Sequence, residues 1–167
     1  MKKPGKNKKM ELFGSAPAKL QLNILTPRGV KFERKADYLS LRAIDGELGI
    51  LPNHAPMTAI LGDGILRIRN NGWEEKLALF EGIVEVRNNV VNIYTTIAQR
   101  PEEIDMERAR REKEDAEADL RGEAKDLDIQ ACLLLIRRAL VRLEVGVHSG
   151  DRGYFEDIDA DADMDEI

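Results

Sequence analysis

The side chains that most often perform catalysis are few in this sequence and are not spaced as an active site. Among 167 residues there are two histidines, His54 and His148, and one cysteine, Cys132. The chain has no G-x-x-x-x-G-K-[ST] phosphate loop, no G-x-S-x-G elbow and no H-E-x-x-H helix. A hydrolytic triad would need Ser40 and His54 to meet by chance, and one cysteine excludes a cysteine zinc cluster. We expect no catalytic residue, no metal site and no required cofactor.

Two other segments are unusual enough to suggest a specific role. Residues 45–57 contain two glycines and two prolines, which predicts a rigid loop of defined shape. Within it, Glu47 is by default a solvated acid, and His54 is by default a loop histidine bonded to the backbone. Residues 104–109, I-D-M-E-R-A, open the first of two predicted helices.

The elements that position these segments begin with a long all-β region, residues 19–98. Apolar and polar residues alternate there, as in K-L-Q-L-N-I at residues 19–24, which is typical of half-buried strands. Asparagines and a glycine at residues 70–72, and asparagines at residues 88–89, tolerate the positive φ of tight hairpin turns. Because no helical crossover separates the strands, we predict an antiparallel sandwich or barrel.

The C-terminal part is predicted to form two helices of different character. Pro101 suits a first helical turn, and 17 of the 26 residues from 100 to 125 are charged, so this helix docks weakly. The apolar face of the second helix consists of Leu133, Ile136, Leu140 and Leu143. Gly146 is its natural terminator. This face is larger than the first helix can cover, so the hairpin is expected to pack on the β region or on a partner, or to move between them.

Charge is concentrated at the two ends of the chain. Residues 1–9 carry five lysines and no acid, whereas residues 151–167 carry eight acids and one arginine. Like charges repel, so both ends are predicted to be solvated tails. Five lysines without interleaved aromatic residues are more typical of a solubilising arm than of a nucleic-acid site. The longest apolar run, residues 131–136, is far shorter than the roughly 20 residues of a membrane span. We therefore expect a cytoplasm-facing protein without a nucleic-acid partner.

Several motifs together resemble those of one known family. Residues 45–56 read D-G-x-x-G-I-L-P-x-H-A-P, followed by L-G-D-G at 61–64 and G-I-V-E-V at 82–86. This series is similar to the epsilon subunit of the rotary F-type ATP synthase over about residues 18–147. The resemblance implies an N-terminal β-sandwich of about ten strands and a C-terminal antiparallel two-helix hairpin. Glu81 departs from the pattern, because many relatives have glycine at that position.

The predicted organisation follows from this resemblance and from the charge pattern. It comprises a basic N-terminal extension (1–17), a β-sandwich domain (18–99), a helical hairpin (100–147) and an acidic disordered tail (148–167). By the resemblance, the sandwich binds the gamma subunit and the loops of the c-ring, and Glu47 and His54 match positions that face those partners. The family's hairpin blocks ATP hydrolysis when it extends to the catalytic beta and alpha subunits, and releases them when it folds back.

The resemblance also implies a nucleotide, because ATP is a regulatory ligand of the hairpin in some bacterial members. The residues that match the family's ATP contacts are Ile104, Asp105, Arg108, Ala109, Arg138 and Arg142. Arginines four residues apart share a helix face and can bind phosphate oxygens. The ordinary alternative is that Asp105 favours the helix dipole and that the arginines form a solvated face or contact an acidic patch on a catalytic subunit. Gln99 and Asp115 differ from a characterised ATP-binding member, which has glutamate and arginine there.

We therefore predict a non-catalytic subunit of a bacterial F-type ATP synthase that couples the c-ring and gamma subunit to rotation. Its mobile hairpin is expected to inhibit ATP hydrolysis and to carry the residues for ATP sensing. Its expected location is the cytoplasmic face of the bacterial cell membrane, where it attaches only through the complex. The alternatives are a stand-alone ATP-sensing module and a general β-sandwich interaction module. Co-purification with the gamma subunit and the catalytic hexamer separates the first from both.

Overall fold

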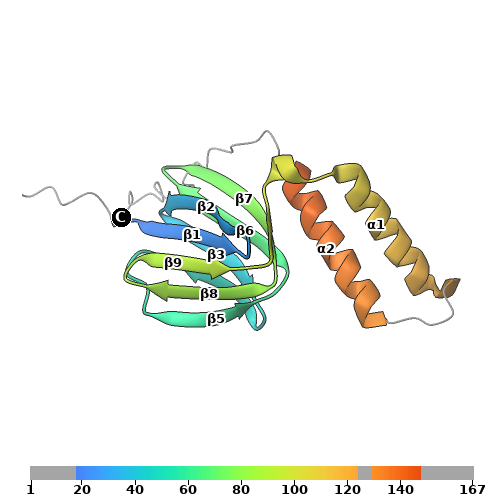
Figure 1. Ribbon diagram of the computed structural model, residues 1–167, viewed down its shortest axis with the longest axis horizontal. Helices are drawn as coiled ribbons and strands as arrows, with labels where there is room; N and C mark the ends of the chain where they lie inside the picture. The colour runs from blue at the N-terminus through green and yellow to red at the C-terminus, as the bar shows by residue number, and fades with distance from the viewer. Residues whose placement is uncertain (1–17, 124–128, 148–167) are drawn as a thin grey trace, which may run out of the picture.

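The described residues, 18–123 and 129–147, form a β-sandwich with a two-helix hairpin at one end (Figure 1). The protein is represented by a computed structural model. Its strands are β1 (Leu20–Thr26), β2 (Gly29–Ala36), β3 (Tyr38–Ala43), β4 (Gly46–Ile50), β5 (Met57–Leu61), β6 (Gly64–Asn70), β7 (Trp73–Phe80), β8 (Gly82–Arg87), β9 (Val90–Tyr94) and β10 (Ile97–Gln99). The predicted basic extension and acidic tail lie outside the described residues.

The ten strands form a single sheet that folds over on itself. Their order is β10-β7-β6-β3-β5-β8-β9-β1-β2, with β4 paired to β3. Neighbouring strands are antiparallel except for β1 and β9, which are parallel. Strand β1 also contacts β10, and β2 contacts β6, so strands distant in this order face one another. The predicted all-β sandwich of about ten strands is confirmed.

The sandwich core follows the alternation seen in the sequence. Leu20, Leu22 and Ile24 of β1 are each 0% exposed, and the residues between them are half-buried. Burying one such side chain stabilises the fold by about 1.5–3 kcal/mol. Asn71 and Gly72 have φ values of 52° and 76° between β6 and β7, as a tight hairpin turn requires. The predicted turn at Asn88 and Asn89 has φ values of 51° and 60°.

The helical hairpin begins with two separate helical segments. A short 3₁₀ turn, η1 (Pro101–Glu103), comes first, and helix α1 (Met106–Ala118) begins only after Asp105. Asp105 is extended, and its carboxylate accepts the backbone N–H of Arg108 over 2.9 Å, so it is the N-cap. Pro101 thus begins a separate 3₁₀ turn, because Ile104 leaves the helical path and is buried against the sandwich.

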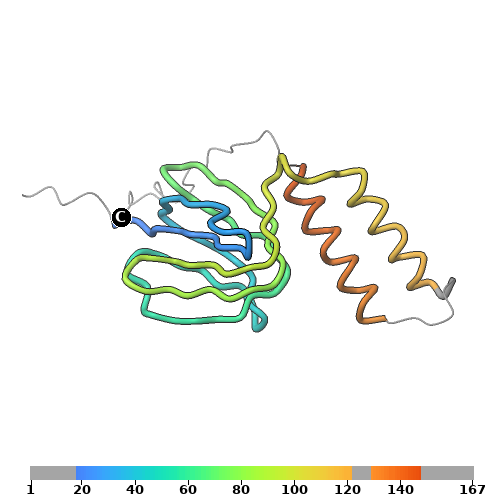
Figure 2. Tube along the Cα trace, in the orientation of Figure 1, coloured from blue at the N-terminus to red at the C-terminus, as the bar shows by residue number. Residues whose placement is uncertain are grey.

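Helix α2 (Ile129–Val147) lies between α1 and the sandwich, where it contacts β6 and β7 (Figure 2). A π-helical turn, η2 (Asp119–Glu123), follows α1. The buried positions of the two helices are mainly small: Ala109 and Ala116 on α1, and Cys132, Ala139, Val145 and Gly146 on α2. Small side chains let two helices approach closely. The hairpin is therefore closed by small residues.

The apolar face of α2 is only partly covered by the rest of the described chain. Leu133 and Leu140 are 46% and 48% exposed, as expected for a face larger than the first helix can cover. Gly146 does not end the helix, which continues to Val147. A Cβ atom on Gly146 would overlap Sδ of Met106, so a larger residue there would require the Met106 side chain to move.

Candidate functional site

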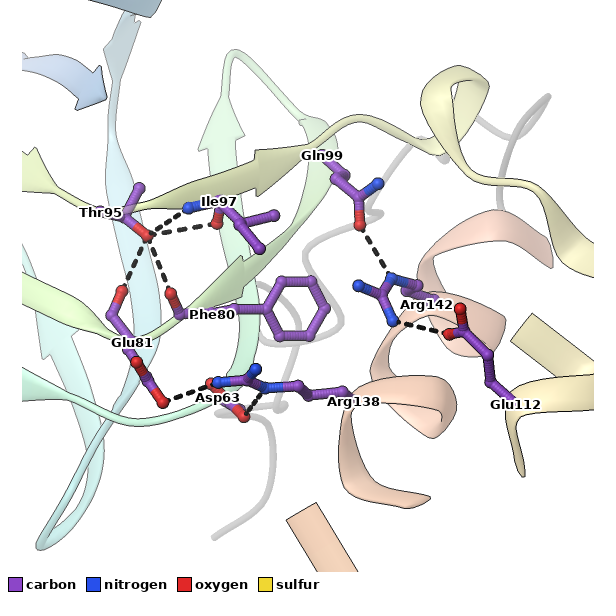
Figure 3. Close-up of polar contacts among 9 residues, drawn as sticks. All are labelled: Asp63, Phe80, Glu81, Thr95, Ile97, Gln99, Glu112, Arg138 and Arg142. Atoms are coloured by element: carbon purple, nitrogen blue, oxygen red, sulfur yellow. Dashed lines mark hydrogen bonds and ion pairs between the residues drawn. The ribbon is translucent and has the colours of Figure 1, made fainter. Parts of the chain in front are cut away.

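The most structured polar site lies where the hairpin meets the sandwich, around the ring of Phe80. Phe80 ends β7, is 1% exposed and belongs to a small apolar cluster with Ala78, Ile104 and Val145. The guanidinium carbons of Arg142 and Arg138 lie 4.7 and 5.8 Å from the ring centroid. Figure 3 shows the ring between these two arginines, an arrangement that permits cation–π attraction to both. We call this region the docking site.

Arg138 joins α2 to two acidic residues of the sandwich. Its Nε donates to Oδ2 of Asp63 over 2.7 Å, and its Nη2 donates to Oε1 of Glu81 over 2.6 Å (Figure 3). The hydrogen bond to Asp63 raises the pKa of Arg138 above its ordinary value, although partial burial opposes this. The side chain of Asp63 is only 2% exposed, and its Oδ1 has no hydrogen-bond partner within the described residues. This buried carboxylate therefore depends on Arg138 for its compensation.

The turn that carries Glu81 is held in an unusual backbone conformation. Glu81 has a φ of 56°, in the left-handed region, and Gly82 follows with a φ of 141°. Oγ1 of buried Thr95 lies 3.1 Å from the carbonyl oxygen of Phe80, 2.8 Å from that of Glu81 and 3.2 Å from that of Ile97. This local conformation explains why glycine is suited to position 81, and it directs the glutamate that replaces it toward Arg138.

Arg142 takes part in a second polar contact, which links α2 with α1. Its Nε donates to Oε1 of Gln99 over 2.9 Å, and its Nη1 donates to Oε2 of Glu112 over 3.1 Å. The other oxygen of Glu112 accepts from Nε of Arg108 over 2.8 Å. One carboxylate thus bridges two arginines from different helices, and we call these three residues the arginine bridge: Arg108, Glu112 and Arg142.

The structure brings together part of the predicted nucleotide set. Arg108 and Arg142 meet at Glu112, while Arg138 is used by the acids of the sandwich. Ile104 packs in the Phe80 cluster, and Ala109 is 1% exposed in α1. Arg138 and Arg142 do not form the solvated helix face of the ordinary alternative, because their side chains are only 24% and 22% exposed at the docking site.

Sequence reasoning did not assign roles to Asp63, Glu81 or Glu112. Asp63 lies between two glycines in L-G-D-G and therefore resembles an ordinary turn residue. Glu81 departs from the glycine of many relatives, and this departure is the sequence signal of a special backbone position. Glu112 follows Arg108 by four residues, a spacing that favours an ion pair on one helix.

The two predicted subunit-contact residues lie on different elements of the sandwich. Glu47 is exposed on β4, and its Oε2 accepts a hydrogen bond from Oγ of Ser40 over 3.0 Å. His54 is half-buried in the loop after β4, with Nδ1 2.8 Å from the carbonyl oxygen of Ala55. The same loop is tied to the β8–β9 turn, since Asn89 Nδ2 donates to Asn53 Oδ1 over 3.3 Å.

The described residues offer little for catalysis. Among residues 18–123 and 129–147, no group of three or more histidine, cysteine or acidic side chains is placed to hold a metal ion. A shallow cavity of about 320 Å³ between β1, β2 and β10 includes none of the predicted nucleotide residues. No helix in the described part of the chain is long and apolar enough to cross a membrane.

Comparison with known proteins relates this geometry to one family. Residues 19–101 match the family described as ATP synthase, Delta/Epsilon chain, beta-sandwich domain. The chain is 38% identical over 133 residues to the ATP synthase epsilon chain of Shouchella clausii, covering 80% of this chain and 98% of the relative. It is 41% identical over 126 residues to the epsilon chain of Bacillus licheniformis, covering 75% and 96%, respectively.

A solved structure shares the fold beyond the sandwich. A chain in a structure of the Euglena gracilis mitochondrial ATP synthase, which contains OSCP, F1 and the c-ring, superposes with a TM-score of 0.67. That match covers 89% of this chain and 91% of the other, at 24% sequence identity. The sequence matches, with most of each relative covered, also confirm the resemblance seen in the motifs. The chain therefore belongs to the ATP synthase epsilon chain family and is a non-catalytic subunit of that kind.

Proposed function

We propose that this chain is a central-stalk subunit of a bacterial F-type ATP synthase that joins the gamma subunit and c-ring and regulates ATP hydrolysis through its hairpin. The observation that carries the regulatory part is the docking site, where a small apolar cluster and the Arg138 ion pairs hold the hairpin. Such a site can be exchanged for another of similar strength when a partner favours the second state. The units proposed to move against each other are residues 18–99 and 100–147.

An exposed apolar row on the sandwich supports the proposed contact with the gamma subunit. Ile60 of β5 is paired with Ile83 of β8, and Ile83 is paired with Tyr94 of β9. These side chains are 57%, 45% and 44% exposed, respectively. Ile44, 68% exposed, adjoins them, because its backbone N–H donates to the carbonyl oxygen of Ile60 over 3.1 Å. A contiguous exposed apolar row of this kind marks an interaction surface.

The exposed face of α2 supports a second, extended conformation of the hairpin. Leu133 and Leu140 are close to half exposed in the closed hairpin, and Ile129 is 54% exposed. A helix in water gains free energy by burying such a stripe against a partner. We place this face against the catalytic beta and alpha subunits when the hairpin extends, which blocks hydrolysis.

The arginine bridge supports ATP as a regulatory ligand. Two guanidinium groups converge there from α1 and α2, and such pairs suit the oxygens of phosphate groups. A stand-alone ATP-sensing module remains the second candidate, since this site needs no other subunit. We place the assembled protein at the cytoplasmic face of the bacterial cell membrane, attached through the complex alone, with Glu47 and His54 toward its neighbouring subunits.

Co-purification tests the assignment to the complex. The tagged full-length chain is expected to bring down the gamma subunit, the catalytic hexamer and the c-ring, whereas a stand-alone module would bring down none of them. Ile60→Asp should reduce recovery at least about tenfold, because it places a charge in an apolar contact. Val30→Asp is the matched control, since Val30 is 59% exposed on the edge strand β2. Equal recovery with both variants would remove the apolar row from the proposal.

A further inference from the structure

We propose that Glu112 is an internal occupant of the anion site between α1 and α2, and that it sets how tightly this chain binds phosphate groups. The inference rests on the proposed ATP sensing and adds the residue that limits it. Glu112 is not among the residues that match the family's ATP contacts. Its role follows from the contacts of its carboxylate.

Each carboxylate oxygen of Glu112 accepts a hydrogen bond from a different arginine. Oε1 accepts from Arg108 over 2.8 Å and Oε2 accepts from Arg142 over 3.1 Å. A phosphate group presents oxygens of the same kind with more charge, so it can bind the same guanidinium groups. It cannot do so while the carboxylate occupies them. Phosphate binding is therefore an exchange reaction in which Glu112 leaves.

Glu112 is well placed for this exchange. It lies on α1, the outer helix, and its side chain is 34% exposed, while that of Arg108 is 74% exposed. Glu112 can therefore rotate into water without leaving a buried charge behind. The other contact of Arg142 in this site is the neutral Gln99, so displacing Glu112 leaves Arg142 with a vacant donor.

A phosphate group would displace the carboxylates of Arg138 much less readily. It is held by two carboxylates, and one of them, Asp63, is only 2% exposed. Displacing Asp63 would leave an uncompensated buried charge, which is strongly unfavourable. An incoming phosphate therefore exchanges with Glu112 and leaves the contact between Arg138 and Asp63 in place.

Calorimetric titration of the full-length chain with ATP and with inorganic tripolyphosphate tests the proposal. Glu112→Gln should bind both anions about tenfold more tightly, since it removes the competing charge and keeps the side-chain shape. Glu114→Gln makes the same charge change on an exposed residue of α1 and should leave the affinity unchanged. Adding Arg108→Gln to Glu112→Gln should abolish the gain, and thermal unfolding checks that each variant is folded.

The possible results separate this inference from ATP sensing itself. If ATP binds the wild type and Glu112→Gln has the same affinity, ATP sensing stands and the role of Glu112 is overturned. The same holds if Glu114→Gln gains as much as Glu112→Gln. If Glu112→Gln binds tripolyphosphate more tightly but ATP binds no better than tripolyphosphate, Glu112 competes with phosphate groups as proposed. The site would then not recognise adenine, and ATP sensing would be overturned. If neither anion binds any variant, both are overturned.

Discussion

The Nε atom of Arg138 lies 2.7 Å from Oδ2 of Asp63 and thereby joins the inner helix of the hairpin to an acid of the sandwich whose side chain is only 2% exposed. Arg138 belongs to α2, whereas Asp63 lies in the turn between β5 and β6. Because the carboxylate is almost completely buried, the ion pair compensates its charge, and removing Arg138 would leave that charge buried without compensation. This pair makes hairpin docking sensitive to a single interaction.

Loss of Arg138 should therefore weaken docking more than loss of Asp63. Arg138→Met leaves Asp63 buried without compensation, which costs about 3–5 kcal/mol of docking free energy. Asp63→Asn leaves Arg138 paired with Glu81 and should cost less, and adding it to Arg138→Met should recover part of the loss. Hydrogen exchange of the α2 amides measures the opening.

Arg137→Met is the control for this series, because Arg137 is an exposed neighbour on the same helix. Its exchange rates should match those of the wild type. Equal protection in Arg138→Met and Arg137→Met would show that the pair does not hold the hairpin.

The sandwich was predictable from the sequence because its signals are local. The alternation around Leu22 and the Asn71-Gly72 turn each specify a backbone geometry without reference to distant residues. The packing of α2 was not predictable in this way. Leu133 and Leu140 showed that the helix is amphipathic, but periodicity does not say what covers the apolar face.

The candidate site shows the same limit of local signals. Arg108 and Arg142 were found from motif positions, whereas Asp63 acquires its role only through a contact 75 residues along the chain. Glu112 is found by its spacing from Arg108, but its second contact, to Arg142, depends on how the two helices pack.

The small residues of α2 give a direct stability test. Ala139 is 0% exposed and lies about two helical turns before Gly146, which lies against Met106 of α1, so Ala139→Leu should destabilise the hairpin by about 1–3 kcal/mol through overpacking. The adjacent Leu140→Ala should destabilise the hairpin less than Ala139→Leu, because the Leu140 side chain is 48% exposed. Denaturant unfolding followed by helical circular dichroism compares them. A larger loss for Leu140→Ala would contradict the described packing.

The turn after β7 should be among the least tolerant of substitution. Gly82→Ala would place a Cβ against the carbonyl oxygen of Tyr94, in addition to the strain of a φ of 141°. Gly29→Ala has a comparable φ of 111° but open space around the added atom. Strain of this kind costs about 1–3 kcal/mol, so Gly29→Ala should lose that amount and Gly82→Ala more. Urea unfolding checks the order, and equal losses would refute the predicted clash.

Acid should weaken the sandwich partly through Asp37. A hydrogen bond from Lys19 and another from the backbone N–H of Asn71 lower the pKa of Asp37 below its ordinary 3.8. A lowered folded-state pKa gives stability that is present above the unfolded value and is lost as the pH falls through the folded one. As the pH falls below about 4, the free energy of unfolding should therefore decrease less in Asp37→Asn than in the wild type. The difference should be under about 1 kcal/mol, because Asp37 is partly exposed to solvent. Parallel losses in both proteins would exclude this contribution.

ATP hydrolysis by the reconstituted complex tests the central claim most directly. A chain lacking residues 100–167 should give faster hydrolysis than the full-length chain, because the inhibitory hairpin is gone. Full-length Asp63→Asn should give slower hydrolysis, because it weakens the docking of the hairpin while the hairpin's own sequence stays intact. Glu33→Gln, an exposed change on β2, should match the wild type. Opposite changes in the first two rates are the predicted result, and hydrolysis unaffected by removal of the hairpin would contradict the account.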